Sequence, residues 1–246
     1  MASAECDRRV PCREKKIVRR SHFAEERPYE REFAGLRQFA AISLKETRQL
    51  TLLHVGRNDA AGYFYCVMEL ADDARRRTEI DPEDYTPATL REWHREQGRI
   101  PAEEVIRIGC DLSRALASLY NHGLVHRDIK PSNIILVGGV PKLADVGLIT
   151  SFRTDSTYVG TEGYLPPEGP GKPAAGIYGL GKVLYELSTG LDRISYPLLP
   201  PGVENYPDLR HWQELNVHQG RDQPRPALAG SRGSGQASSR LVADHK

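Results

Sequence analysis

The sequence predicts an α+β fold in two lobes, with a mostly β part that contains one helix, followed by a mostly helical part. Between positions 50 and 70, aromatic and β-branched residues alternate with their neighbours, as they do in strands. Beyond position 100, the apolar residues recur at helical spacing instead. A chain of 246 residues is long enough for one sizeable core or two modest lobes, which fits this division.

The first 20 residues are basic, and we predict that they are irregular apart from one short β-like patch at Ile17-Val18. A helix is predicted over 28–40, because Pro28 suits a first helical position. Apolar residues also share one face of this helix, at Tyr29, Phe33, Leu36 and Ala40. Strands are predicted within 50–70, around a turn at 56–59 with the sequence Gly-Arg-Asn-Asp.

A long helix is predicted over 101–123, with a proline and acidic residues at its start and a glycine at its end. Its apolar stripe consists of Ile108, Leu112, Leu116 and Leu119. Short strands are predicted at 134–137 and 141–144, and a second apolar helix over 177–187 that Gly190 ends. The tail from about His218 is rich in Gly, Ser, Pro and Arg, so we predict that it is disordered.

The composition excludes several kinds of protein. Basic and acidic residues number 34 and 33, so no positive excess favours a nucleic acid partner. No run approaches the roughly 20 apolar residues of a membrane span, and no secretory leader precedes the fold, so we expect no membrane segment. The four cysteines suit neither a zinc ribbon nor a disulfide scaffold, and we expect a reducing, cytoplasmic location.

The stretch 125–136, with the sequence Val-His-Arg-Asp-Ile-Lys-Pro-Ser-Asn-Ile-Ile-Leu, carries the chemistry. It follows a predicted buried helix and leads into a short strand, so its polar groups lie on a loop held by rigid elements. An acidic turn at 143–148 follows the next strand. Phosphoryl transfer needs such groups, namely a carboxylate to orient the attacking hydroxyl, a cation for the phosphate, and oxygen ligands for magnesium.

The pattern His-Arg-Asp-x-Lys-x-x-Asn at 126–133, followed by Asp-x-Gly at 145–147, resembles the catalytic core of bacterial-like serine/threonine protein kinases. The sequence Gly-Thr-Glu-Gly-Tyr-Leu-Pro-Pro-Glu at 160–168 resembles the end of a kinase activation segment. The resemblance implies a two-lobed kinase-like fold, truncated in both lobes. It would comprise a partial N-lobe over 1–71, a partial C-lobe over 72–217 and a disordered tail over 218–246.

The same resemblance implies ATP-dependent phosphoryl transfer to a Ser or Thr of a protein that the sequence does not identify. Asp128 would be the catalytic base, and Lys130 would contact the γ-phosphate. Asn133 and Asp145 would hold magnesium. Taken alone, each of the two aspartates also fits a solvated turn.

Further residues would support or regulate this core. The resemblance gives His126 and Arg127 structural and regulatory roles, and Thr161 would brace the catalytic loop. Glu168 would pair with an arginine, for which Arg225 is a weak candidate. A phosphate in the middle of the activation segment would pair with Arg127, and an unmodified loop is the alternative. The candidate phosphorylation sites are Thr154, Ser156 and Thr157.

Upstream, Lys16 resembles the strand lysine of kinases that binds the α- and β-phosphates. Glu32, near the apolar face of the predicted helix, resembles the glutamate that pairs with this lysine. Lys16 and Glu32 also fit solvated surface charges. Lys15 and Glu30 are the alternatives if the register differs by one or two positions.

Residues 67–71, Val-Met-Glu-Leu-Ala, resemble the hinge that binds adenine through backbone groups. Met68 would be the gatekeeper, and Glu69 and Ala71 would complete the ATP-binding set. A buried edge strand is the alternative interpretation.

Several positions depart from the family pattern. No glycine-rich loop precedes Lys16, Val146 replaces a phenylalanine, and Gly176 replaces an aspartate that supports the catalytic loop. The likeness ends after about Val217, so we expect a fragment or a tail translated in a different frame. Two alternatives to an active kinase remain, a catalytically silent kinase-like binding module and a small-molecule phosphotransferase of related fold.

Overall fold

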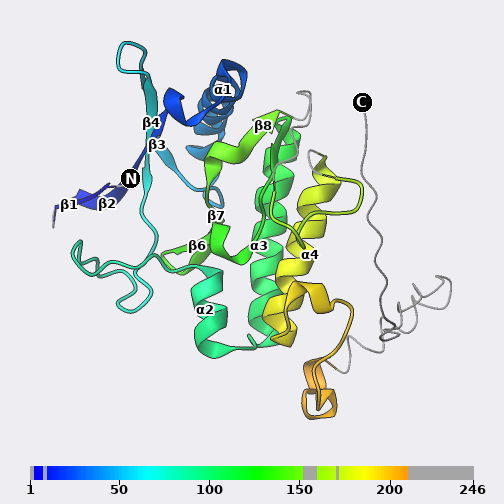
Figure 1. Cartoon of the computed structure of the whole chain (residues 1–246). Helices are drawn as coiled ribbons and strands as arrows, with labels where there is room; N and C mark the ends of the chain where they lie inside the picture. Colours follow the sequence, from blue (N-terminus) through cyan, green and yellow to red (C-terminus); the bar gives the residue numbers. More distant parts are fainter. Residues whose placement is uncertain (1–2, 8–9, 152–159, 170–171, 210–246) are drawn as a thin grey trace, which may run out of the picture.

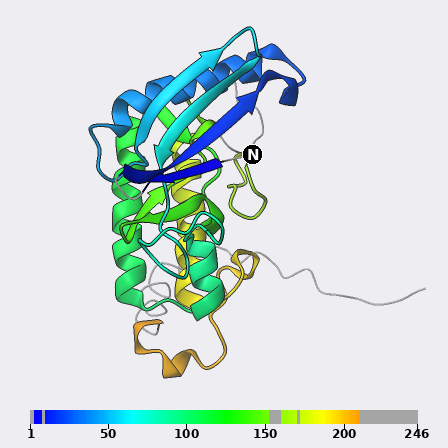
Figure 2. The same cartoon turned by 90° about the vertical axis from the view of Figure 1, so that its left-hand side faces the viewer.

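The computed structural model describes residues 3–7, 10–151, 160–169 and 172–209. A four-stranded sheet with one long helix forms one part, and three helices form the other, with two short two-stranded sheets between them (Figure 1). Turned by 90°, the molecule shows α1 (Glu26–Ser43) lying along one face of the sheet (Figure 2).

The sheet is antiparallel, with the strand order β1-β2-β4-β3. Its strands are β1 (Ser3–Asp7), β2 (Val10–Arg19), β4 (Tyr63–Glu69) and β3 (Leu52–Asn58). The β-like patch predicted at Ile17-Val18 lies in β2, but the prediction that the rest of the first 20 residues is irregular was wrong. Charged side chains hide the strand pattern of β2 in the sequence, and pairing with β4 along seven successive positions defines the strand.

The turn between β3 and β4 lies after the predicted one, over 59–62 instead of 56–59. Gly56 is a strand residue that faces Tyr65 across the ladder. A Cβ atom at Gly56 would lie 2.5 Å from the Tyr65 ring, so glycine serves close packing there. Gly62, at φ +66°, provides the turn conformation.

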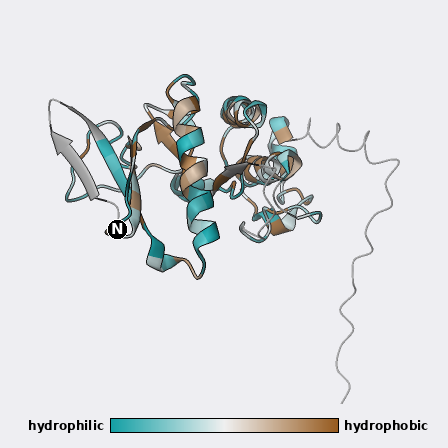
Figure 3. Cartoon of the chain, turned by 90° about the horizontal axis from the view of Figure 1, so that it is seen from above, coloured by the Kyte–Doolittle hydropathy of each residue, from teal (hydrophilic) through white to brown (hydrophobic). Residues whose placement is uncertain are grey.

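Helix α1 confirms the helix predicted over 28–40, although Pro28 is its third residue and not its first. Tyr29, Leu36 and Phe39 on its inner face are at most 1% exposed. The Tyr29 ring lies 5.0 Å from that of Phe64 on β4, and the helix also packs against η3 (Val146–Leu148) and β8 (Ile149–Ser151). Viewed from above, the helices carry both hydrophilic and hydrophobic residues, as amphipathic helices do (Figure 3).

The helical part contains α2 (Leu90–Gln97), α3 (Ala102–Asn121) and α4 (Pro173–Thr189). Helices α3 and α4 confirm the two predicted apolar helices, and α4 begins four residues earlier than expected. Helix α2 was not predicted, because eight residues give too short an apolar stripe. Its boundary signals are present, since the Thr89 side chain accepts a hydrogen bond from Glu92 N and Gly98 ends it at φ +68°.

Two short antiparallel sheets of two strands each carry the polar turns of the predicted site. Strand β5 (Leu124–His126) pairs with β8, and β6 (Ile134–Val137) pairs with β7 (Val140–Leu143). The first of the short strands was predicted correctly, and the second is shifted by one residue. The described 3-10 helices are η1 (Arg20–His22), η2 (Pro131–Asn133), η3, η4 (Arg193–Ser195) and η5 (Val203–Asn205).

One buried cluster runs through both parts of the molecule. It includes Leu36 of α1, Leu52 of β3, Val146 of η3 and Leu116 of α3. The sheet, the helices and the turn at 145–148 therefore share a single apolar core. No helix in the described ranges has the length and apolar character to cross a membrane. The predicted tail at 218–246 and Arg225 lie outside the described residues, and the division at 71–72 stays a prediction.

Replacing Leu36 by Ala should lower the free energy of unfolding by about 2–5 kcal/mol, because it removes a buried side chain and leaves a cavity. Leu44, which caps α1 and is 65% exposed, supplies the matched control. Leu44→Ala should change the free energy of unfolding by less than about 0.5 kcal/mol. Urea denaturation of both variants measures the difference, and equal losses would contradict the shared core.

Candidate active site

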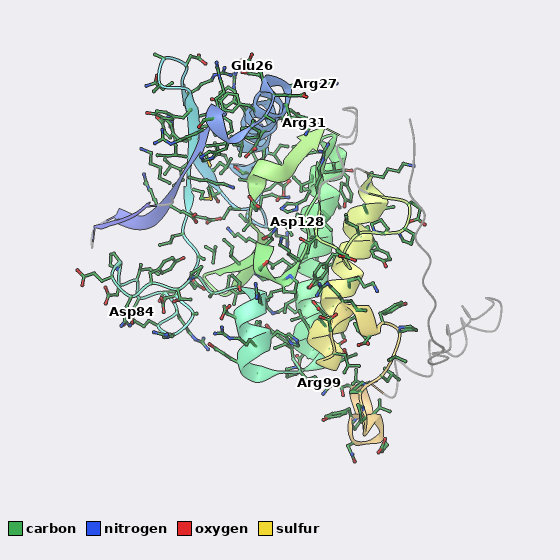
Figure 4. All side chains as sticks on the ribbon, in the orientation of Figure 1. Glu26, Arg27, Arg31, Asp84, Arg99 and Asp128 are labelled. Carbon is green, nitrogen blue, oxygen red and sulfur yellow. The ribbon has the colours of Figure 1, made fainter. Side chains whose placement is uncertain are left out.

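Asp128 lies between β5 and η2 and is 7% exposed. The Thr161 hydroxyl donates to its Oδ1 at 2.7 Å, and the Asn133 amide donates to its Oδ2 at 2.9 Å. The Lys130 ammonium lies 2.6 Å from Oδ2 and also donates to the Thr161 hydroxyl at 2.8 Å. In Figure 4, Asp128 lies at the centre of the molecule, between the sheet with α1 and the long helices.

These partners decide the charge of Asp128. Burial alone would raise the pKa of its carboxyl group. Hydrogen bonds from Lys130 and Thr161, with the lysine charge, outweigh burial and bring this pKa below its ordinary value. Asp128 is therefore an anionic acceptor at neutral pH.

His126 joins the loop over 126–133 to the acidic turn at 143–148. It is buried, and its Nε2 lies 2.7 Å from the Ala144 carbonyl oxygen, while the Asp128 N–H donates to its Nδ1 at 3.4 Å. Nε2 therefore carries the proton that is donated to Ala144. Burial lowers the pKa of His126, which keeps the imidazole neutral.

Arg127 is 6% exposed, and its Nε has no hydrogen-bond partner among the described residues. Burial lowers the pKa of this guanidinium, and the charge of Arg31 lowers it further. Figure 4 places Arg31 on α1. Arg127 thus contributes buried positive charge beside the loop, with a second cation on the neighbouring helix.

Lys16 pairs with Asp145, with 2.7 Å between Nζ and Oδ1, and so joins β2 to the acidic turn. Burial would lower the pKa of Lys16, but the charges of Asp145 and Glu32 outweigh it and raise the pKa. Asp145 has φ +55°, a left-handed conformation that is uncommon for residues other than glycine. Such strain often accompanies functional positions.

The expected Lys16–Glu32 ion pair is not formed, because the Asp145 carboxylate takes the lysine instead. The Glu32 carboxylate lies beside Gly147, so close that a Cβ atom there would collide with it. Glycine at the third position of the Asp-x-Gly turn thus makes room for this carboxylate. Burial raises the pKa of Glu32 to about 7, although the charge of Lys16 opposes the shift.

The alternative residues, Lys15 and Glu30, contact other parts of the molecule. The Lys15 ammonium lies 5.0 Å from the centroid of the Tyr65 ring, whereas its neighbour Lys16 lines the cleft. Glu30 forms two 2.7 Å hydrogen bonds with Arg57. Lys16 and Glu32, in contrast, both lie beside Gly147 of the acidic turn.

A cleft of about 530 Å³ opens between the two parts of the molecule. Five of the predicted residues line it, namely Lys16, Met68, Ala71, Asn133 and Asp145. Glu69 does not, since its side chain instead binds the Lys142 ammonium at 2.5 Å and the Thr51 N–H at 2.7 Å. Glu14 also lines the cleft and was not predicted, although its spacing of two residues from Lys16 on one strand could have revealed it.

Comparison with known proteins decides the family. Residues 51–195, more than half of the chain, match the model of the protein kinase domain. This chain belongs to the protein kinase family. Its motifs are of the serine/threonine type, as the resemblance of the catalytic loop implied.

Relatives of this kinase domain include bacterial serine/threonine kinases. PknL of Mycobacterium tuberculosis is 38% identical over 112 residues, which are 42% of this chain and 28% of PknL. AfsK of Streptomyces coelicolor is 32% identical over 142 residues, 53% of this chain and 18% of AfsK. PknB of Mycobacterium leprae is 36% identical over 114 residues, 42% of this chain and 18% of PknB. The chain thus spans less than a third of the length of these relatives.

At Gly176, where kinases carry an aspartate, the phenol of Tyr120 occupies the adjoining space, so that a Cβ atom would collide with its hydroxyl. This hydroxyl is buried without a hydrogen-bond partner among the described residues. Gly176 and Gly179 lie directly against Ile129 of the catalytic loop. Apolar packing therefore supports the loop here, in place of carboxylate hydrogen bonds.

The end of the activation segment is held by a second polar network. The Tyr164 hydroxyl donates to buried Glu186 on α4, which also accepts a hydrogen bond from Arg193 N at 3.1 Å. The Arg193 guanidinium covers the Tyr164 ring at 4.7 Å and donates to the Glu162 carbonyl oxygen at 3.1 Å. Glu168 is exposed. The candidate phosphorylation sites Thr154, Ser156 and Thr157 lie outside the described residues.

The raised pKa of Glu32 predicts that Glu32→Gln increases the free energy of unfolding by an amount that depends on pH. The folded state holds the Glu32 proton up to about pH 7, whereas the unfolded chain releases it near pH 4.5. The wild type therefore loses stability relative to the variant as pH rises from about 4.5 through 7, by an amount on the order of 1–3 kcal/mol. Below pH 4.5 the two should be equal.

Thermal or urea unfolding of both proteins from pH 4 to 8 measures this difference. Glu103→Gln, an exposed change of equal charge on α3, serves as the control and should show no such trend. A constant difference between Glu32→Gln and wild type across this range would refute the assigned burial of Glu32.

Proposed function

We propose that this kinase domain transfers the γ-phosphoryl group of ATP to a serine or threonine hydroxyl of a protein. The observation that carries the proposal is the anionic Asp128, which Lys130, Asn133 and Thr161 hold. Of these partners, Asn133 lines the cleft together with Lys16 and Asp145. A base, a phosphate-binding cation and oxygen ligands thus lie within one site.

Asp128 is suited to orient an incoming hydroxyl, because its carboxylate is ionised and fixed by donors on both oxygens. Lys130 provides positive charge 2.6 Å from that carboxylate, where a transferring phosphate would need it. Thr161 connects both residues to the end of the activation segment. The protein substrate would therefore lie along the residues that follow Thr161.

The residues present fit magnesium. Asn133 donates its amide hydrogens to the backbone oxygen and the carboxylate of Asp128, both at 2.9 Å, which leaves its amide oxygen available. With the Asp145 carboxylate, this oxygen forms the hard donor set that magnesium prefers. Bound magnesium would offset the negative charge of the ATP phosphates.

The cleft also suits a nucleotide. Met68, Ala71 and Ile135 form apolar walls for a base, and Lys16 is placed to pair with phosphate oxygens. A cytoplasmic location is part of this proposal, since ATP is available there and Cys66 and Cys110 are free thiols.

Asp145→Ala should abolish the stabilisation that Mg·ATP confers, because it removes the proposed metal-binding carboxylate. At a ligand concentration of 100 Kd, the wild type should gain about 2.7 kcal/mol, equivalent to several degrees in Tm. Asp84→Ala, in an exposed loop ion pair, is the matched control and should keep the full shift. A folded wild type without any shift at saturating Mg·ATP would disprove the nucleotide site.

Asp128→Asn should lower phosphoryl transfer by about 10²–10⁴-fold, because an amide cannot accept the proton of the attacking hydroxyl. Mass spectrometry after incubation with Mg·ATP can measure self-phosphorylation, for which Thr154, Ser156 and Thr157 are the expected acceptors. Phosphate in wild type alone would support an active kinase. Nucleotide binding without transfer would instead favour the silent binding module, and phosphate in both samples would indicate a contaminating kinase.

A further inference from the structure

Glu14 brings a second carboxylate into the nucleotide cleft, near the end where the base would lie. It pairs in register with Met68 of β4 and lies two residues before Lys16, on the same face of β2. All three residues line the cleft, as does Ala71 of the segment after β4. Met68 and Ala71 are apolar, so the Glu14 carboxylate interrupts a wall that otherwise suits an uncharged ring.

The charges around Glu14 do not neutralise it. On its own strand, Lys16 attracts it, but that ammonium already pairs with Asp145 at 2.7 Å. Asp145 repels Glu14 from the turn before η3, and Tyr85 approaches from the loop before α2. Two further titratable groups lie nearby, His22 on the wall of the same cleft and Glu32 of α1 beside Lys16. One lysine thus faces three carboxylates.

A ligand that fills the cleft would remove the remaining water from this carboxylate. Burial already raises the pKa of Glu14, with Lys16 opposing and Asp145 reinforcing the shift, so its charged form is poorly solvated before any ligand binds. Phosphate groups near Lys16 would add negative charge to the same space. An uncharged nucleoside would also remove water from the Glu14 carboxylate, but it would not add the charge repulsion that phosphate groups bring.

We propose that the Glu14 carboxylate is a specificity determinant of the cleft, which lowers affinity for anionic purine nucleotides relative to the uncharged nucleoside. The inference rests on the proposed nucleotide site and goes beyond it, because it concerns the choice between ligands. Its determinant is the charge of Glu14 and not its size.

Calorimetry with Mg·ADP and with adenosine tests this directly, since neither ligand can be turned over. Glu14→Gln keeps the size of the side chain and removes its charge. It should tighten Mg·ADP binding about tenfold relative to adenosine binding, and this gain should shrink at high salt. Glu14→Ala should show the same change in selectivity, and Glu103→Gln, an exposed change of equal charge, should show none.

The outcomes separate this inference from the function on which it rests. If wild type binds both ligands and Glu14→Gln leaves their affinity ratio unchanged, the role of Glu14 is refuted and the nucleotide site stands. If Glu14→Ala alone changes the ratio, side-chain size and not charge is responsible, and the inference also fails. If no folded variant binds either ligand, the nucleotide site itself is wrong.

Discussion

The carboxylate of Asp128 is the point on which the geometry of this kinase domain depends. Lys130 and Asn133 reach it from the same loop, and Thr161 reaches it from a segment more than 30 residues further along. Because the group is almost fully buried, each of these contacts is stronger than it would be in water, and losing one would leave a buried charge poorly paired. The loop over 126–133 and the end of the activation segment therefore form one network of polar contacts around Asp128.

A second set of contacts connects this network to the sheet. His126 bonds to Ala144, the residue before Asp145, and Asp145 pairs with Lys16 of β2. The Glu32 carboxylate of α1 fits against Gly147 in the same turn. Strand, helix and turn thus meet around the Lys16 ammonium group and the carboxylates of Asp145 and Glu32.

The helical part supports the site in a way that differs from the family pattern. Where kinases have an aspartate, Gly176 admits the Tyr120 ring, and Ile129 packs against the glycine backbone. Apolar contacts hold a side chain in place through close packing and not through directional bonds, so α4 supports the loop by packing against Ile129. Nearby, Glu186, Tyr164 and Arg193 provide the directional bonds that hold the segment after Thr161.

The sequence by itself determined the fold class, the long helices and the residues of the catalytic loop, because apolar periodicity and close motif spacing are local properties of the chain. It did not show that β2 is a strand, since only pairing with β4 overrides its charged composition. Nor did it show that Lys16 pairs with Asp145 or that Glu14 enters the cleft. These features join residues far apart in the chain, and packing in three dimensions decides which opposite charges meet.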